Sequence, residues 1–195
     1  MVIAAEVRTE SSVALYWLPL GAGGSGCVRW NGRLFEIAQA RREHRRPQQL
    51  YHAALEVYLD AARYVIEMGP VWSHRDPRRG VVFEGPVGST WLGHSRWFRY
   101  EVRCWSDGVI DDIAYAVGGP CVVSTDRDQV QRLLDLVAAA PRHTWGRDEA
   151  GAGDMWNSNS LVAWLLGRSG VALDGLGPPP GGRAPGWRAG VVCAA

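Results

Sequence analysis

The sequence predicts an α+β domain in which a small antiparallel sheet packs against two helices. Residues 51–59 alternate between two sets of side chains, and 63–68 follow as a second strand after a two-residue turn, which indicates an antiparallel hairpin. Residues 126–140 and 156–166 carry apolar side chains at helical spacing. We expect the later helix to bury its apolar side against the sheet.

Length and charge limit the classes of function. The 195 residues suffice for one domain with a core, 1–195, which ends in a Pro/Gly-rich tail at about 175–190. The net charge of +1 gives no overall field that favours nucleic acid or an anionic membrane. All 21 residues with a fixed positive charge are Arg and none is Lys, which is typical of a high-GC genome.

Cysteine usage and hydropathy predict a cytoplasmic protein without a bound metal or cofactor. The four cysteines form no C-x-x-C pair, and none lies near a His at metal-ligand spacing, so we expect unpaired thiols in a reducing compartment. The N-terminus lacks a basic segment followed by a long apolar one, which argues against a signal peptide. No apolar run reaches membrane-spanning length.

The first fifty residues predict a strand at 13–20 and a helix at 34–45. The Gly-rich loop 21–26 between them lacks the Lys of a phosphate-binding loop and the G-x-G-x-x-G order. A short strand at 27–30 and a turn at Asn31-Gly32 are expected to follow that loop.

The central region predicts further strands at 81–83, 96–105 and 121–124. Residues 96–105 alternate between an aromatic and charged face and an apolar face, which predicts a half-exposed antiparallel strand. Residues 109–117 are compatible with a short helix or with irregular structure.

Two helices and the tail complete the predicted fold. Helix 126–140 has Thr125 and Asp128 at capping-box spacing, and helix 156–166 has Asn157 or Asp154 as its cap. The tail is expected to return as a last strand at 191–192. The residues on the apolar sides of these elements, which we expect in the core, are Leu55, Val57, Leu133, Val137, Leu161, Trp164 and Leu165.

The predicted hairpin brings a histidine and a carboxylate together. With Asp60-Ala61 as its turn, Ala54 lies opposite Glu67, so His52 and Glu67 are diagonal neighbours on one face with Cβ atoms roughly 7–8 Å apart. A Glu bound to one ring nitrogen of a His leaves the other nitrogen free as a base. An ordinary exposed pair on a wet sheet face is the alternative, and Glu56 is a rival partner.

Ser158 lies in the first turn of the late helix, over the positive end of the helix dipole. Unpaired N–H groups at such a position can hold a developing oxyanion, so the serine is a candidate nucleophile. The alternative is a helix cap and nothing more, because Asn-Ser-Asn-Ser before an apolar run is what capped helices commonly carry.

The order His, acid and nucleophile resembles the permuted papain-like superfamily, the lecithin–retinol acyltransferase and permuted NlpC-like group. The resemblance lies in Tyr51-His52-Ala-Ala-Leu-Glu-Val, Tyr64-Val-Ile-Glu67 and Asn157-Ser158-Asn-Ser-Leu-Val162, about a third of the chain. It implies His52 as base, Glu67 as orienting acid, Ser158 as nucleophile, and a papain-like α+β fold. The sequence departs from the family at Ser158, where the family has Cys, and a Ser hydroxyl depends more on its base.

Three functions stay open at this point. The first is a hydrolase or acyltransferase that attacks an amide or ester carbonyl through a Ser-His-Glu triad, acting on a small-molecule or peptide/acyl substrate. The second is a catalytically silent papain-like binding module, and the third is an enzyme that uses another site such as Cys27 beside the Gly-rich loop. The residues that we expect to contact substrate are Trp72, Trp91, Trp156 and Asn157.

Overall fold

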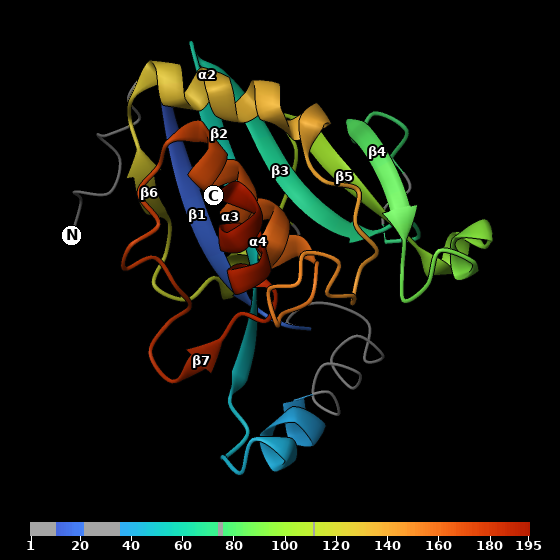
Figure 1. The fold of residues 1–195 in the computed structure, drawn as a ribbon. Helices are drawn as coiled ribbons and strands as arrows, with labels where there is room; N and C mark the ends of the chain where they lie inside the picture. Colours follow the sequence, from blue (N-terminus) through green and yellow to red (C-terminus); the bar gives the residue numbers. More distant parts are fainter. Residues whose placement is uncertain (1–10, 22–35, 74–75, 111) are drawn as a thin grey trace.

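The computed structural model describes residues 11–21, 36–73, 76–110 and 112–195, and it confirms an α+β fold (Figure 1). Six strands form one antiparallel path in the order β4-β5-β3-β2-β1-β6. Their bounds are β1 Ser11–Pro19, β2 Gln49–Leu59, β3 Ala62–Pro70, β4 Val81–Pro86, β5 Arg99–Ser106 and β6 Cys121–Ser124. A seventh short strand, β7 (Gly182–Arg183), pairs in parallel with the start of β2.

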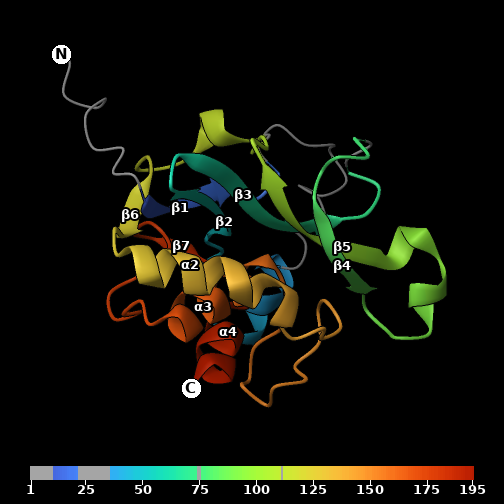
Figure 2. The ribbon, with the colours of Figure 1, turned by 90° about the horizontal axis from the view of Figure 1, so that it is seen from above.

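Helices α2 (Arg127–Leu136), α3 (Ser158–Ser169) and α4 (Trp187–Ala194) lie together on one face of the sheet (Figure 2). A further helix spans residues 36–42. Short 3-10 turns are η1 Leu92–His94, η2 Arg96–Phe98, η3 Ile113–Tyr115 and η4 Val137–Ala139. The two helices predicted at 126–140 and 156–166 are therefore present.

The hairpin of β2 and β3 has the predicted register. Leu59 pairs with Ala62, and the pairing runs in the described chain as far as Leu55 and Ile66. Asp60 and Ala61 form the turn with φ values of 47° and 68°, the left-handed pair that a two-residue hairpin turn needs. Neither residue is Gly, so both carry the conformational cost of a left-handed backbone. Arg127 of α2 contacts the turn, since its Nε donates to Asp60 Oδ1 at 2.9 Å.

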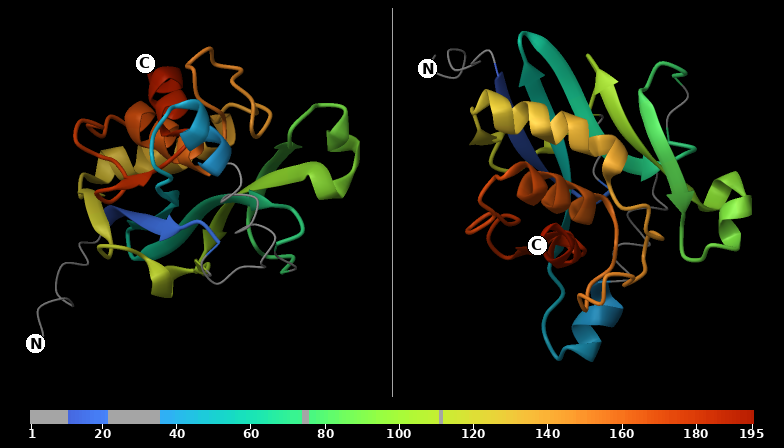
Figure 3. Two further views of the ribbon diagram at one scale, coloured as in Figure 1. Left: turned by 90° about the horizontal axis from the view of Figure 1, so that it is seen from below. Right: turned by 45° about the horizontal axis from the view of Figure 1, so that its top comes forward.

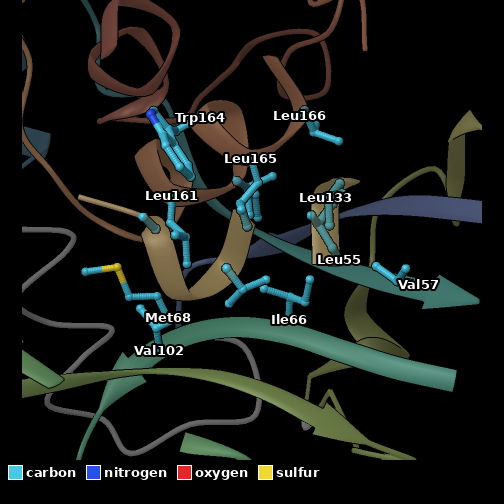
Figure 4. Packing of buried hydrophobic residues seen from close by; sticks show 14 of the residues in the cluster. Leu55, Val57, Ile66, Met68, Val102, Leu133, Leu161, Trp164, Leu165 and Leu166 are labelled. Atoms are coloured by element: carbon cyan, nitrogen blue, oxygen red, sulfur yellow. The ribbon is translucent and has the colours of Figure 1, made fainter. Parts of the chain in front are cut away.

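The main core lies between the sheet and the helices (Figure 4). All seven residues that the sequence places in the core are buried, and none is more than 7 % exposed. Leu55, Val57 and Ile66 lie on the side of the sheet that faces the helices, in one cluster with Leu133 of α2 and with Leu161 and Leu165 of α3. A smaller buried cluster covers the opposite face and consists of Ala14, Tyr16, Leu18, Ala54, Val65 and Ile110.

The charged face of β5 is a correction to the half-exposed strand that the alternation predicts. Glu101 and Arg103 are 0 % and 2 % exposed. Arg79 donates to both carboxylate oxygens of Glu101 at 2.6 and 2.7 Å, and Arg103 Nε donates to the same carboxylate at 2.6 Å. The charges are thus buried as a hydrogen-bonded group, which alternation along one strand does not reveal.

Smaller differences concern element ends. Asp126, not Thr125, caps α2, because its carboxylate accepts from the N–H groups of the two residues that follow Arg127. The tail returns as helix α4, not as a strand at 191–192. The strand expected at 27–30, the turn at Asn31-Gly32 and most of loop 21–26 lie outside the described residues.

Other sequence-based expectations concern thiols and membranes. Cys104, Cys121 and Cys193 are free thiols, and Cys27 lies outside the described residues. Among the residues that the structure describes, no helix combines the length and apolar character that crossing a bilayer requires.

Candidate functional site

The first turn of α3 is held by a complete capping box around Asn157. Asn157 Oδ1 accepts from the N–H groups of Asn159 and Ser160 at 2.9 and 3.3 Å, and the Asn157 N–H donates to Ser160 Oγ at 3.0 Å. Asn157 Nδ2 donates to the carbonyl of Pro185 at 2.8 Å, which ties the tail to the helix start. The Asn157 side chain therefore already binds both the helix start and the tail. A contact between Asn157 and substrate stays a prediction.

Asn159 connects the start of α3 to strand β2. Its Nδ2 donates to the Tyr51 carbonyl at 3.0 Å and to the Pro185 carbonyl at 2.8 Å. Tyr51 directly precedes His52, and Asn159 directly follows Ser158. The sequence neighbours of the candidate base and the candidate nucleophile are therefore in direct contact, although they are more than a hundred residues apart in sequence.

Ser158 is the first residue of α3 and is 5 % exposed. Neither its hydroxyl nor its backbone N–H has a hydrogen-bond partner among the described residues, whereas the next two N–H groups are bound by Asn157. The unpaired donors lie at the positive end of a twelve-residue helix. This combination can stabilise negative charge on an oxygen atom beside Ser158.

His52 lies opposite Leu18 of β1, near the start of β2. Alternation along the strand puts its side chain on the face of Ala54 and Glu56, whereas α3 packs on the other face. Ser158 and His52 thus approach the same end of β2 from different sides. No hydrogen bond joins the two side chains in the described structure. Burial lowers the pKa of His52 to about 4, so the ring is neutral at pH 7.

The carboxylate expected to orient His52 has a different partner. Glu67 lies opposite Arg103 in the pairing of β3 with β5, and its Oε2 accepts from Arg103 Nη1 at 3.4 Å. The rival Glu56 accepts from Tyr16 Oη at 2.9 Å and from Arg63 Nε at 2.6 Å. Burial, followed by the bond to Glu56, raises the pKa of Tyr16 to about 12. Both carboxylates share the His52 face, but each is bonded to other side chains.

The tryptophans expected at a substrate site lie in three different environments. Trp156 is only 2 % exposed and packs edge-on against His143, with ring centroids 5.0 Å apart, so it belongs to the core. Trp72 is half-buried just after β3. Trp91 is 76 % exposed and precedes η1, on a projection beyond β4 and β5 that lies away from α3 (Figure 3). The structure does not gather these rings around Ser158.

Two features escape sequence reasoning. Asn159 Oδ1 is buried and has no hydrogen-bond partner in the described chain, while its Nδ2 joins two segments. His143 Nδ1 lies 3.0 Å from Glu149 Oε2 in the loop before α3, a second His–carboxylate pair. The second Asn in the sequence Asn-Ser-Asn-Ser is the one sequence signal that could have indicated the role of Asn159. The second feature depends on a loop conformation that no periodicity predicts.

Comparison of the chain with protein-family models, with curated proteins and with solved structures gives no significant match.

Proposed function

We propose that the protein is a hydrolase or acyltransferase that attacks an amide or ester carbonyl at the junction of α3 and β2. Ser158 is the nucleophile and His52 is the base in this proposal. The observation that supports this proposal is the hydrogen bond from Asn159 Nδ2 to the Tyr51 carbonyl. This bond fixes the start of α3 beside β2, the strand that contains His52.

The reaction follows from the state of the two side chains. Ser158 Oγ attacks the carbonyl carbon while the neutral His52 ring takes the hydroxyl proton. The ring then passes that proton to the leaving group as the bond from carbon to the leaving group breaks, and an acyl-serine is formed. Water or another acceptor next attacks the acyl group by the same sequence. The unpaired N–H of Ser158 is a donor available to the oxyanion.

A pKa of about 4 makes the resting His52 a weak base. Negative charge that develops on the substrate oxygen raises the proton affinity of a nearby ring, so proton transfer becomes favourable as the oxyanion forms. Because His52 lies on the face of β2 opposite α3, the proposal does not depend on a resting Ser–His hydrogen bond, and it requires the His52 ring to reach Ser158 around the start of β2 when substrate binds.

A papain-like architecture is part of this proposal. An antiparallel hairpin that carries a His and an acid, followed by a late buried helix that opens with the nucleophile, supports it. Glu67 is the orienting acid in this scheme, and its Oε2 also accepts from Arg103 Nη1 at 3.4 Å.

A catalytically silent binding module is the second candidate. The observation that favours it is that both carboxylates near His52 are bonded elsewhere, Glu67 to Arg103 and Glu56 to Arg63. A histidine whose neighbouring carboxylates are bonded to arginines is a poorer general base, whereas a binding role requires no general base.

Labelling with a fluorophosphonate distinguishes the two candidates. Trypsin cleaves after Arg147 and Arg168, so one peptide contains Ser158 and Ser160, and fragmentation separates these two serines. We expect the label on Ser158, and we expect Ser158→Ala and His52→Ala each to remove it. Ser169→Ala is the matched control, because Ser169 is a buried serine of the same helix whose hydroxyl donates to the Leu166 carbonyl at 2.8 Å, and it should leave labelling unchanged.

A folded protein that shows no label on Ser158, or labelling that persists after His52→Ala, contradicts the enzyme proposal. The first result leaves the binding module as the better account, and the second shows that His52 is not the base.

A further inference from the structure

A short projection between β4 and β5 carries large exposed aromatic side chains. Residues 87–98 include η1 and η2 and form the outermost part of the molecule on this side (Figures 1 and 2). Trp91, Trp97 and Phe98 are 76, 69 and 43 % exposed. Three large rings exposed within eight residues are more apolar surface than a short loop usually presents to water, and such surface is typical of interaction sites.

The projection is also basic. Residues 85–100 contain no Asp or Glu, but they contain His94, Arg96 and Arg99. Arg99 is neutralised by Glu84 at the base of the projection, at 2.9 Å. Arg96 is exposed and has no ion pair in the part of the chain that the structure describes. One unpaired positive charge, that of Arg96, thus lies beside the two most exposed tryptophans of the described residues.

The base of the projection is firmly held. The Val87 N–H donates to the Phe98 carbonyl at 2.8 Å, and the Gly88 N–H donates to the Trp145 carbonyl at 2.9 Å. Gly93 of η1 lies so close to Pro86 that an added Cβ would be 2.8 Å from the proline Cβ. The rings are therefore presented by an ordered backbone, and the fold does not need them for its core.

We propose that residues 87–98 dock onto the surface of an anionic lipid bilayer. Trp91, Trp97 and Phe98 enter the interfacial region, which favours amphipathic rings, and Arg96 lies at the level of the phosphates. The shape of the projection favours a lipid surface over a protein partner. A stable protein–protein interface buries about 800 Å² of surface on each partner, whereas only the end of this narrow projection is available for contact. The proposal is independent of the chemistry at Ser158.

Co-sedimentation with vesicles tests the proposal, with phosphatidylcholine vesicles made with and without phosphatidylglycerol. The wild-type protein should sediment with the anionic vesicles and much less with the neutral ones. Trp91→Ser combined with Trp97→Ser should weaken binding by about tenfold or more, because two interfacial rings are lost. Arg96→Glu should weaken it by roughly fivefold or more on anionic vesicles only.

Matched controls lie elsewhere on the surface. Val122→Ser removes a side chain that is 52 % exposed on β6, and Arg42→Glu reverses an exposed charge on helix 36–42. Both should bind as the wild type does, and all variants should keep the wild-type unfolding midpoint, because the changed side chains are exposed.

Three results would overturn the proposal. One is a wild-type protein that does not sediment with anionic vesicles, and another is binding that the double tryptophan variant retains in full. The third is concentration-dependent self-association in sedimentation velocity, lost in that variant, without vesicle binding. That result would make a second copy of the chain the occupant of this surface.

Discussion

At the scale of single residues, His52 is the side chain whose ionisation the fold changes most within the candidate site. Burial alone lowers its pKa to about 4, and no carboxylate counteracts this shift. Its neighbours on the same face, Glu56 and Glu67, are instead bonded to Arg63 and Arg103. The site therefore holds a neutral imidazole at physiological pH, and proton uptake at this position opposes folding.

The low pKa of His52 predicts an acid-sensitive stability. The ring has a lower pKa in the folded chain than in the unfolded chain, where it is about 6.5, so the unfolded state binds more protons between these values. The contribution of His52 to the free energy of unfolding should be fully present above about pH 6.5. This contribution should fall by about 2–3 kcal/mol as the pH decreases to about 4.

Denaturant unfolding at several pH values measures this loss, and His52→Gln, which does not titrate, should reduce it. An NMR titration that places the His52 pKa near 6.5 would contradict the buried position of the ring.

At the scale of elements, α3 and the β2–β3 hairpin position the site. Helix α3 is buried on almost every side, since ten of its residues from Ser158 to Ser169 are buried. The polar groups at the start of α3 therefore need partners within the protein. The side chains of Asn157, Asn159 and Ser160 donate hydrogen bonds to carbonyl groups of the tail and of β2. Pairing with β1 places His52 opposite Leu18, one residue after the Tyr51 carbonyl that Asn159 contacts.

The turn of this hairpin can be improved. Ala61 has a φ of 68°, which costs an alanine about 1 kcal/mol and a glycine almost nothing. Ala61→Gly should therefore stabilise the protein by about 0.5–1 kcal/mol in denaturant unfolding.

Ala62→Gly is the matched control for this turn. It changes the next exposed alanine, which lies in the paired strand, and should destabilise. Equal effects of the two substitutions would show that the left-handed turn is absent in solution.

At the scale of the whole molecule, local patterns predict the hairpin and the helices but not their joining contacts. The register of β2 and β3 follows from two strands and one turn, and the core follows from apolar periodicity. The hydrogen bonds of Glu67 and Glu101 depend on the pairing of β3 with β5. The alternation of side chains along one strand does not predict which strand is its neighbour. The bond from Asn159 to Tyr51 depends on the packing of segments that are far apart in sequence.

The tail shows the same limit. Val191 and Val192 indicate a strand, yet the segment forms α4. Gly190 lies so close to α3 that an added Cβ would be 2.2 Å from the Ser160 carbonyl oxygen, and Trp187 packs on Trp17 with ring centroids 5.1 Å apart. Close packing of two helices selects the helical form here, against the local preference of valine for strands.

The proposed pairing of Ser158 with His52 can be tested without a substrate in the variant Ser158→Cys. Alkylation of the introduced thiol by iodoacetamide can be followed across pH in the tryptic peptide 148–168, which contains no native cysteine. Cys104 interferes little, because burial raises its pKa to about 11.

We predict that the introduced thiol has a pKa well below the ordinary value of about 8.5, and that this pKa returns toward the ordinary value when His52→Ala is added. A pKa above about 8.5, or a pH profile that His52→Ala leaves unchanged, would contradict the proposed pairing.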